Sequence, residues 1–158
     1  MNAHMGYLLV FCAHYDRDKG LDYGRLILEH IDRGHQNIWK AVSSHRRGQG
    51  NESFHIWGGM LPPAYRCPLV TQLKVTTTPI NLAHVRGVDG NFYPISPYEM
   101  KTDKGDKRGD YGIHLDKNHD GSLGCIVMNQ KNFSDYQNTM TRLRAEGVNK
   151  LPLVVGYS

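Results

Sequence analysis

Short strand-forming segments separated by turn residues fill the first 98 residues of this chain, and they favour a β-rich fold. Residues 7–13 form an apolar run of the length of one strand. Residues 25–31 and 37–43 flank a polar turn in which Gly34 can adopt a positive φ. We predict a buried strand for the first segment and a β-hairpin for the other two, with a short helix at 26–31 as the alternative.

Further segments along the chain predict more strands. Residues 64–69 look extended, and residues 73–78 are rich in β-branched side chains. Residues 88–95 carry an Asp-Gly turn signal, and the segments 126–128 and 151–157 are short apolar runs. These five segments continue the strand-and-turn pattern to the end of the chain.

One helix is predicted near the C-terminus. Four apolar side chains recur at steps of three, four and three residues, as on one face of a helix: Phe133, Tyr136, Met140 and Leu143. Ser134 and Gln137 form a capping-box pattern, and Gly147 is a natural stop. Arg142 and Arg144 lie in the last turn, where the helix dipole favours cations.

The chain is therefore predicted to be mainly antiparallel β with one packed amphipathic helix near its C-terminus. Its 158 residues suit a single domain with one core. Residues 101–110 are polar and contain glycine, which predicts a mobile loop. We interpret residues 1–5 as a cloning remnant ahead of a native start near Met5.

Composition limits the classes of partner. A formal net charge of +4 and a sequence pI of about 9.0 favour anionic partners such as nucleic acid, anionic lipid or the carboxylate-rich bacterial wall. The basic residues are scattered, however, and no nucleic-acid motif is present. No apolar run approaches the ~20 residues of a membrane-spanning helix, and residues 7–13 lack the flanks of a signal peptide. We expect a solvated basic surface, no nucleic-acid partner and no membrane span.

The three cysteines differ in their surroundings. Cys12 and Cys67 lie in strand-like segments, where we expect them to be small buried hydrophobic side chains. A disulfide between these two residues is left open by the sequence. Cys125 instead follows a glycine and precedes an apolar run, in the part of the chain that is richest in reactive residue types.

Residues 112–128 gather two histidines, two aspartates, a serine and a cysteine. A nucleophilic cysteine needs a nearby base, exposure to the substrate and donors for the oxyanion. Gly124 leaves room beside the Cys125 thiol, so that backbone N–H groups can approach a tetrahedral intermediate. His114 lies eleven positions before Cys125, a separation that two neighbouring strands can close, and His119 is the nearer rival. The alternative is a structural cysteine beside a polar loop.

The same residues allow metal-binding interpretations. The first half of an EF-hand calcium loop is matched by Asp116, Asn118, Asp120 and Gly121. Val127 stands where that pattern requires Glu, and no helical pattern precedes the loop. A zinc site would have to be formed by His114, His119 and Cys125, whose spacing is not standard. We therefore favour a tight polar turn and expect neither a metal nor another cofactor.

Residues 122–128, Ser-Leu-Gly-Cys-Ile-Val-Met, resemble the active-site signature of the L,D-transpeptidase catalytic domain, in which Ser or Thr, any residue, Gly and Cys precede apolar residues. Residues 112–114, Gly-Ile-His, match the upstream histidine element of that family. Residues 43–44 and 59–66 resemble its small-residue and Pro-x-Gly-x-Tyr strand region. The resemblance covers residues 24–158 and is greatest to a shortened branch that includes wall-targeting toxins of secretion systems.

This resemblance implies a β-sandwich or barrel-like fold and a cysteine acyl-enzyme mechanism on peptidoglycan stem peptides. It makes Cys125 the nucleophile and His114 the base, with the backbone N–H groups of Gly124 and Cys125 as the oxyanion hole. Ser122 would shape the loop, and a backbone carbonyl near Leu115 would orient the histidine ring. The acyl group would pass to an amine, as in a transpeptidase, or to water, as in a carboxypeptidase or endopeptidase.

Substrate contacts are the least determined part of this hypothesis. Arg108, Tyr111 and His119 lie near the signature and are the candidates for binding the stem peptide. Leu123 and Val127 stand where many members have His and either Arg or Asn, which leaves the acyl acceptor open. The resemblance implies action at the bacterial wall or periplasm, with a delivery or immunity partner. A non-catalytic wall-binding module on the same fold is the alternative.

Overall fold

The computed structural model of the chain describes residues 6–16, 21–43, 73–85, 88, 90–96, 99–101, 107–109, 111–116 and 125–157. Residues 1–5 and the predicted extended segment 64–69 lie outside these ranges. The other predicted strands and the predicted helix fall within or overlap them, so that most of the predicted order of elements can be compared with the structure.

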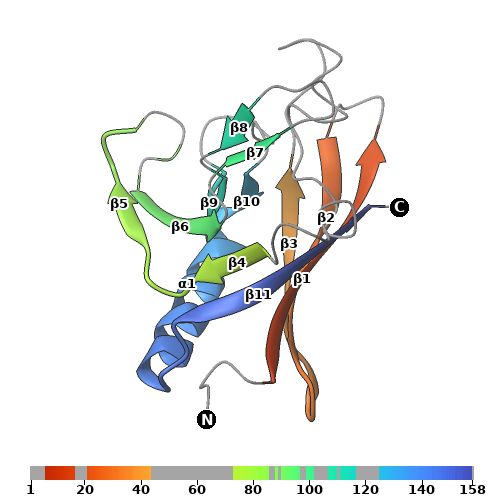
Figure 1. Cartoon of the computed structure of the whole chain (residues 1–158), viewed down its shortest axis with the longest axis vertical. Helices are drawn as coiled ribbons and strands as arrows, with labels where there is room; N and C mark the ends of the chain where they lie inside the picture. The colour runs from red at the N-terminus through yellow and green to blue at the C-terminus, as the bar shows by residue number, and fades with distance from the viewer. Residues whose placement is uncertain are drawn as a thin grey trace.

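Strands dominate the described part of the chain (Figure 1). The elements are β1 (Tyr7–Asp16), β2 (Leu21–His30), β3 (Gly34–Ser43), β4 (Leu73–Thr76), β5 (Ile80–Leu82), β6 (Gly90–Ser96), β7 (Glu99–Lys101), β8 (Lys107–Gly109), β9 (Gly112–Leu115), β10 (Ile126–Met128), α1 (Gln130–Ala145) and β11 (Lys150–Tyr157). Nine strands form one sheet in the order β4-β11-β1-β2-β3-β10-β9-β6-β5, and β4 also pairs with β6. Eight strands therefore close into a barrel, which confirms a mainly β, barrel-like fold with one C-terminal helix.

Strand β1 shows how one side of the closed sheet faces the core. Leu9, Phe11 and Ala13 are buried, whereas Cys12 and His14 between and beyond them are exposed. Successive side chains on a strand point to opposite faces, so the apolar run is buried on one side only. The strand prediction is confirmed, but the expected burial of Cys12 is wrong, because Cys12 is an exposed free thiol on the outer side.

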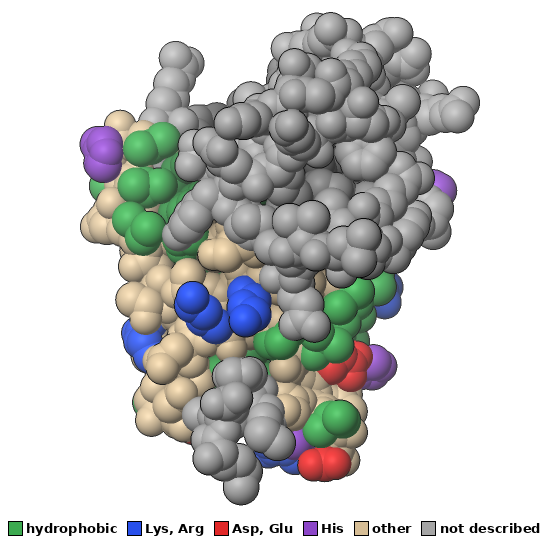
Figure 2. Space-filling view, viewed as in Figure 1, with side chains coloured by type: hydrophobic (Ala, Val, Ile, Leu, Met, Phe, Trp, Pro, Cys, Tyr) green, Lys and Arg blue, Asp and Glu red, His purple; other side chains and the backbone are tan. Residues whose placement is uncertain are grey.

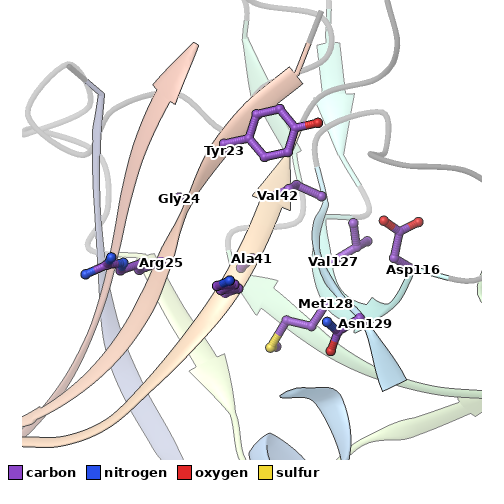
Figure 3. Close-up of a pocket in the computed structure, with 10 residues that line it drawn as sticks. Tyr23, Gly24, Arg25, Ala41, Val42, Asp116, Val127, Met128 and Asn129 are labelled. Carbon is purple, nitrogen blue, oxygen red and sulfur yellow. The ribbon is translucent and has the colours of Figure 1, made fainter. Parts of the chain in front are cut away.

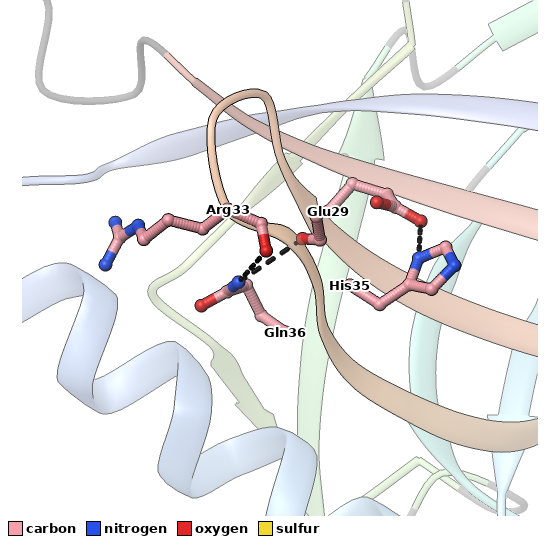
Figure 4. A network of polar contacts seen from close by, with 5 residues as sticks. Glu29, Arg33, His35 and Gln36 are labelled. Atoms are coloured by element: carbon pink, nitrogen blue, oxygen red, sulfur yellow. Dashed lines mark hydrogen bonds and ion pairs between the residues drawn. The ribbon is translucent and has the colours of Figure 1, made fainter.

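The predicted hairpin is present as β2 and β3. Gly34 has a φ of 75°, as the tight connection requires. At the tip, Gln36 Nε2 donates hydrogen bonds to the carbonyl oxygens of Arg33 and Gly34, at 3.4 and 3.3 Å (Figure 4). His35 contacts the Glu29 carboxylate across the same turn. The short-helix alternative for residues 26–31 is therefore excluded.

Two strand pairs depart from the antiparallel pattern. β1 pairs with β11 in parallel, and β9 pairs with β10 in parallel. The other pairings in the sheet are antiparallel. The prediction of a mainly antiparallel fold therefore holds for most of the sheet, and the exception at β9 and β10 determines how the candidate site is assembled.

Four described residues of the polar segment 101–110, predicted as a mobile loop, belong to strands. Its two ends belong to β7 and β8, which pair with each other in an antiparallel two-stranded sheet. Lys101 pairs with Lys107, and Met100 pairs with Arg108. The expectation of a loop throughout this segment is wrong at both ends, because backbone pairing between the two arms outweighs their weak individual strand propensity.

The C-terminal helix packs its apolar side into the core. Phe133, Tyr136, Met140 and Leu143 are buried as predicted, and α1 contacts β3, β9 and β10. The N-cap is Asn129, whose side chain accepts a hydrogen bond from the Asn132 backbone N–H at 2.9 Å. The predicted cap at Ser134 is thus wrong, since that residue lies inside the helix.

The C-terminal end of α1 agrees with the prediction. Gly147 has a φ of 92°, and the Val148 N–H reaches back to the Leu143 carbonyl at 2.9 Å. This arrangement satisfies a helix-terminal carbonyl that would otherwise lack a partner. The two arginines of the last turn are Arg142 and Arg144.

The described surface carries mixed charges. On the face shown in Figure 2, Lys and Arg side chains are spread among polar and apolar ones rather than gathered into a single large patch. No helix within the described residues has the length and apolarity that crossing a membrane requires.

Candidate functional site

The predicted site residues are described unequally by the structure. Cys125 and His114 are both described, and Cys125 is half-buried. Gly124, Ser122 and His119 lie outside the described residues. The geometry of the site therefore begins with one pair of residues, the predicted nucleophile and the predicted base.

The parallel pairing of β9 with β10 brings the segment that follows Cys125 alongside the strand that carries His114. Ile126 is the register partner of Ile113, and Val127 is the partner of His114. Continued one residue beyond the start of β10, the same register would place Cys125 beside Gly112. His114 is then the next residue of β9 on the same side of the sheet. Strands about 4.8 Å apart with a rise of about 3.3 Å per residue put the two Cα atoms about 8 Å apart, within reach of the two side chains.

The side of the sheet that carries this pair is opposite to the core. Ile113, Ile126 and Met128 belong to the core cluster that includes α1. His114, Val127 and Phe92 are buried too, but His114 and its two cross-strand partners form a separate row on the outer side. The candidate site is thus on the outer side of the closed sheet, next to strands whose inner side is tightly packed.

Ring orientation at His114 suits a general base. Its Nδ1 lies 2.8 Å from the Leu115 backbone carbonyl oxygen, which can only accept a hydrogen bond. Nδ1 therefore carries the proton in the neutral ring, and Nε2 carries the lone pair. A hydrogen bond from the ring to a backbone carbonyl near Leu115 was expected from the sequence and is present.

Burial also shifts the titration of His114. Desolvation lowers the pKa of His114 below the usual 6.5, and the hydrogen bond to Leu115 opposes this shift in part. His114 is only 7% exposed. The ring is consequently neutral at pH 7, with a lone pair available to take a proton.

Phe92 forms a wall of the site that the sequence alone does not reveal. Its ring lies 5.9 Å from the His114 ring, centroid to centroid, with the planes tilted by 30°. A Cβ atom added at Gly112 would lie 2.2 Å from Phe92 Cζ. Gly112 is therefore needed because the aromatic ring occupies the space that any larger residue would fill, beside the backbone of Cys125.

The structure describes Tyr111 and Arg108, two of the predicted substrate contacts, to different extents. Tyr111 is 2% exposed and belongs to the core cluster, so its side chain packs in the interior. Arg108 lies on β8, which pairs with β7 in a separate two-stranded sheet. The position of the Arg108 side chain is outside what the structure describes.

A pocket of about 540 Å³ is lined by residues of β2, β3 and β10 and by the residues that follow β9 and β10, and neither Cys125 nor His114 is among them (Figure 3). Val127, the register partner of His114, contributes to its wall. The lining residues are Tyr23, Gly24, Arg25, Lys40, Ala41, Val42, Asp116, Val127, Met128 and Asn129. Of these, only Asp116 and Val127 are candidates of the sequence analysis, and both were considered there for calcium.

The metal-binding alternatives find no support among the described residues. No group of three or more His, Cys, Asp or Glu side chains is placed to hold a metal ion within that part of the chain. Three of the residues required by those interpretations, Asn118, His119 and Asp120, lie outside it.

Comparisons with known proteins found no matching family model, no matching curated protein and no matching solved structure. The resemblance to L,D-transpeptidases accordingly depends on the sequence of residues 112–114 and 122–128 and of the weaker matches upstream.

Proposed function

We propose that this chain is a cysteine acyltransferase or hydrolase acting on bacterial peptidoglycan stem peptides, with Cys125 as the nucleophile and His114 as the base. The observation that carries the proposal is the parallel register of β9 and β10, in which Val127 pairs with an oriented His114. Continued by one residue beyond β10, this register would bring Cys125 to the same side of the sheet as that histidine. A structural cysteine would not require such a partner.

The chemistry follows from the position of the proton. His114 Nε2 takes the proton of the Cys125 thiol as the sulfur attacks a peptide carbonyl. The tetrahedral intermediate expels its amine, which takes the proton back from the imidazolium, and an S-acyl bond remains. Water or a second amine then attacks the thioester with His114 again as the base. The hydrogen bond to Leu115 keeps the ring in the required tautomer throughout.

The choice of peptidoglycan as the substrate depends on the sequence resemblance. The Ser-Leu-Gly-Cys segment and the upstream Gly-Ile-His segment are the two elements of the family signature. A net charge of +4 is favourable for approach to a polyanionic wall. By the same resemblance, Gly124 and Cys125 supply the oxyanion donors, and Ser122 shapes their loop.

The test is to incubate the protein with a purified disaccharide tetrapeptide and to record both the product masses and the mass of the intact protein. We expect an acyl adduct that peptide mapping assigns to Cys125. Exposed Cys12 is an internal control, since a merely reactive substrate would label it as well. Loss of one D-Ala identifies a carboxypeptidase, and dimeric products identify a transpeptidase. Binding to peptidoglycan without any adduct would instead support the non-catalytic module.

A further inference from the structure

An apolar row crosses four neighbouring strands on the outer side of the sheet. Its members are register partners on β11, β1, β2 and β3: Val154, Val10, Ile27 and Ile38. The residues on either side of Val10 and Ile27 in the sequence belong to the core cluster, so the row itself faces outward. Val154 is 42% exposed and Ile38 is 51% exposed, with the other two half-buried between them. A contiguous apolar surface of this kind marks an interaction site more often than isolated apolar side chains do.

Opposite charges flank the apolar row on β2. Arg25 precedes Ile27 by two residues and Glu29 follows it by two, so the three side chains share the outer side. Arg25 is exposed, forms no ion pair within the part of the chain that the structure describes, and extends away from Asp116 (Figure 3). Glu29 contacts His35 near the hairpin tip (Figure 4). A carboxylate has several acceptor sites, so this contact leaves Glu29 able to accept from a second donor.

A two-fold axis along the apolar row would make this face complementary to itself. A half-turn about the row keeps Ile27 of one copy opposite Ile27 of the other, and it exchanges the two flanks. Arg25 of each copy then faces Glu29 of the other. Both residues lie about 7 Å from Ile27 along β2, so the two ion pairs match in position. An axis along β2 would instead set Arg25 against Arg25, where like charges repel.

We propose that the outer face of β11, β1, β2 and β3 is a homodimer interface, with the apolar row on the two-fold axis and two reciprocal Arg25–Glu29 ion pairs beside it. A second copy of this chain fits because the face offers both signs of charge at equal distances from its apolar centre. The half-turn also makes β2 antiparallel to its copy, as the aligned packing of two sheets requires. None of these residues belongs to the proposed Cys125–His114 pair, so the inference is independent of the proposed function.

The apolar row and the charges have different tasks in such an interface. Exposed ion pairs contribute little to affinity on their own. The apolar row therefore supplies most of the free energy of association, through the area that it removes from water. The ion pairs select the orientation, because any other axis leaves charges unpaired or sets like charges against each other.

The test measures self-association of the full chain by sedimentation equilibrium over a range of protein concentrations. We expect dimers and no larger species, because an isologous face is fully used in the dimer. Arg25→Glu sets two carboxylates against each other twice per dimer and should raise the dissociation constant at least about tenfold. Lys131→Glu, at an exposed lysine of α1, changes the net charge by the same amount and should leave the dissociation constant unchanged.

An exchange of charges distinguishes this axis from general stickiness. Glu29→Arg should weaken the homodimer as Arg25→Glu does, and the double variant should recover most of the lost affinity. A mixture of the two single variants forms both ion pairs only in the heterodimer, which should exceed either homodimer in native mass spectra. A wild type that stays monomeric, or a mixture without excess heterodimer, would overturn the proposal.

A second measurement locates the axis without altering the charged pair. Ile27→Cys and Lys40→Cys, each in a Cys12→Ala background, are treated with a short bismaleimide, and the background protein alone measures capture through the remaining cysteines. The two copies of position 27 face each other across sheets about 10 Å apart, so the dimer should be captured there. Position 40 lies two residues off the row, which displaces its two copies by about 13 Å along the strands. Equal capture at both positions, or capture at neither, would contradict the proposed axis in variants whose thermal midpoints match that of the background.

Discussion

The two sides of β9 and β10 carry different kinds of side chain: apolar ones on the inner side, and an ionisable histidine on the outer side. The inner side presents Ile113, Ile126 and Met128 to the core, and each is no more than 1% exposed. The outer side presents His114 with the Phe92 ring beside it, and Val127, the partner of His114, forms part of the wall of a charged pocket. Because successive side chains of a strand point to opposite faces, the inward-facing and outward-facing residues of β9 and β10 are adjacent in the sequence.

The two sides differ in what burial does to the free energy of folding. On the inner side, burial of apolar side chains stabilises the fold at about 25 cal/mol per Å². On the outer side, the same degree of burial is applied to an ionisable ring, and it lowers the pKa of His114. A buried titratable group has a cost for stability, so its presence is better explained by chemistry than by packing.

The largest effect is expected on the outer side, for Cys125→Ala. Without the thiol no thioester can form, and turnover of a tetrapeptide stem should fall on the order of 10⁴-fold or more. The thermal midpoint should stay unchanged, because the change removes one atom at a half-buried position. Cys12→Ala, at an exposed thiol on β1, is the matched control and should keep full turnover. Substantial turnover in the Cys125→Ala variant would show that another residue is the nucleophile.

His114→Gln should cost about 10²- to 10⁴-fold in turnover, the usual contribution of a positioned base. Glutamine keeps a polar group of similar reach but cannot take a proton near neutral pH. Burial lowers the pKa of His114, so the acidic limb of the wild-type rate profile should lie below pH 6.5. An unchanged profile in the variant would show that another group is the base.

The same shift predicts a pH dependence of stability. The folded state has the lower histidine pKa, so between the two pKa values the unfolded state binds more protons. Stability should therefore fall as pH drops below about 6.5, the pKa of an unfolded histidine. Urea denaturation at a series of pH values should show a smaller fall for His114→Gln than for the wild type.

The inner side can be predicted from the sequence because its signals are local. Steps of three and four residues reveal the buried face of α1, and Gly34 reveals the hairpin. The cap is missed because the apolar spacing starts at Phe133, whereas Asn129 begins the helix one turn earlier through polar residues. Cys12 is misplaced because an uninterrupted apolar run hides the alternation that exposes it.

The outer side is only partly predictable. The signature indicates Cys125 and His114, but the arrangement of their two segments side by side depends on a parallel register that no local signal encodes. Phe92 comes from β6, whose pairing with β9 joins distant parts of the chain. Lys40 lines the pocket only because β3 and β10 meet at Val127. A hydrophobic period identifies the face of each strand, but it does not say which strands are neighbours.

Ile113→Ala tests the inner side one residue away from His114. Ile113 is 0% exposed, and its truncation should lower the free energy of unfolding by about 2–5 kcal/mol. Ile38→Ala, at a side chain 51% exposed, should change it by no more than about 0.5 kcal/mol. Chemical denaturation measures both values. A stable Ile113→Ala variant would show that the inner side is not the part of the sheet that holds the fold together.

Gly112→Ala tests how tightly the outer side of the sheet is packed, for comparison with the inner side tested by Ile113→Ala. The new methyl group would overlap the Phe92 ring, so the ring must move at a cost of about 1–3 kcal/mol. Since Phe92 also contacts the His114 ring, turnover should fall together with stability. The double variant with Phe92→Leu frees the space and should be more stable than the sum of the two single variants predicts. Strict additivity of the two free-energy changes would mean that the ring and the glycine do not interact, and that the outer side is less tightly built around His114 than its burial implies.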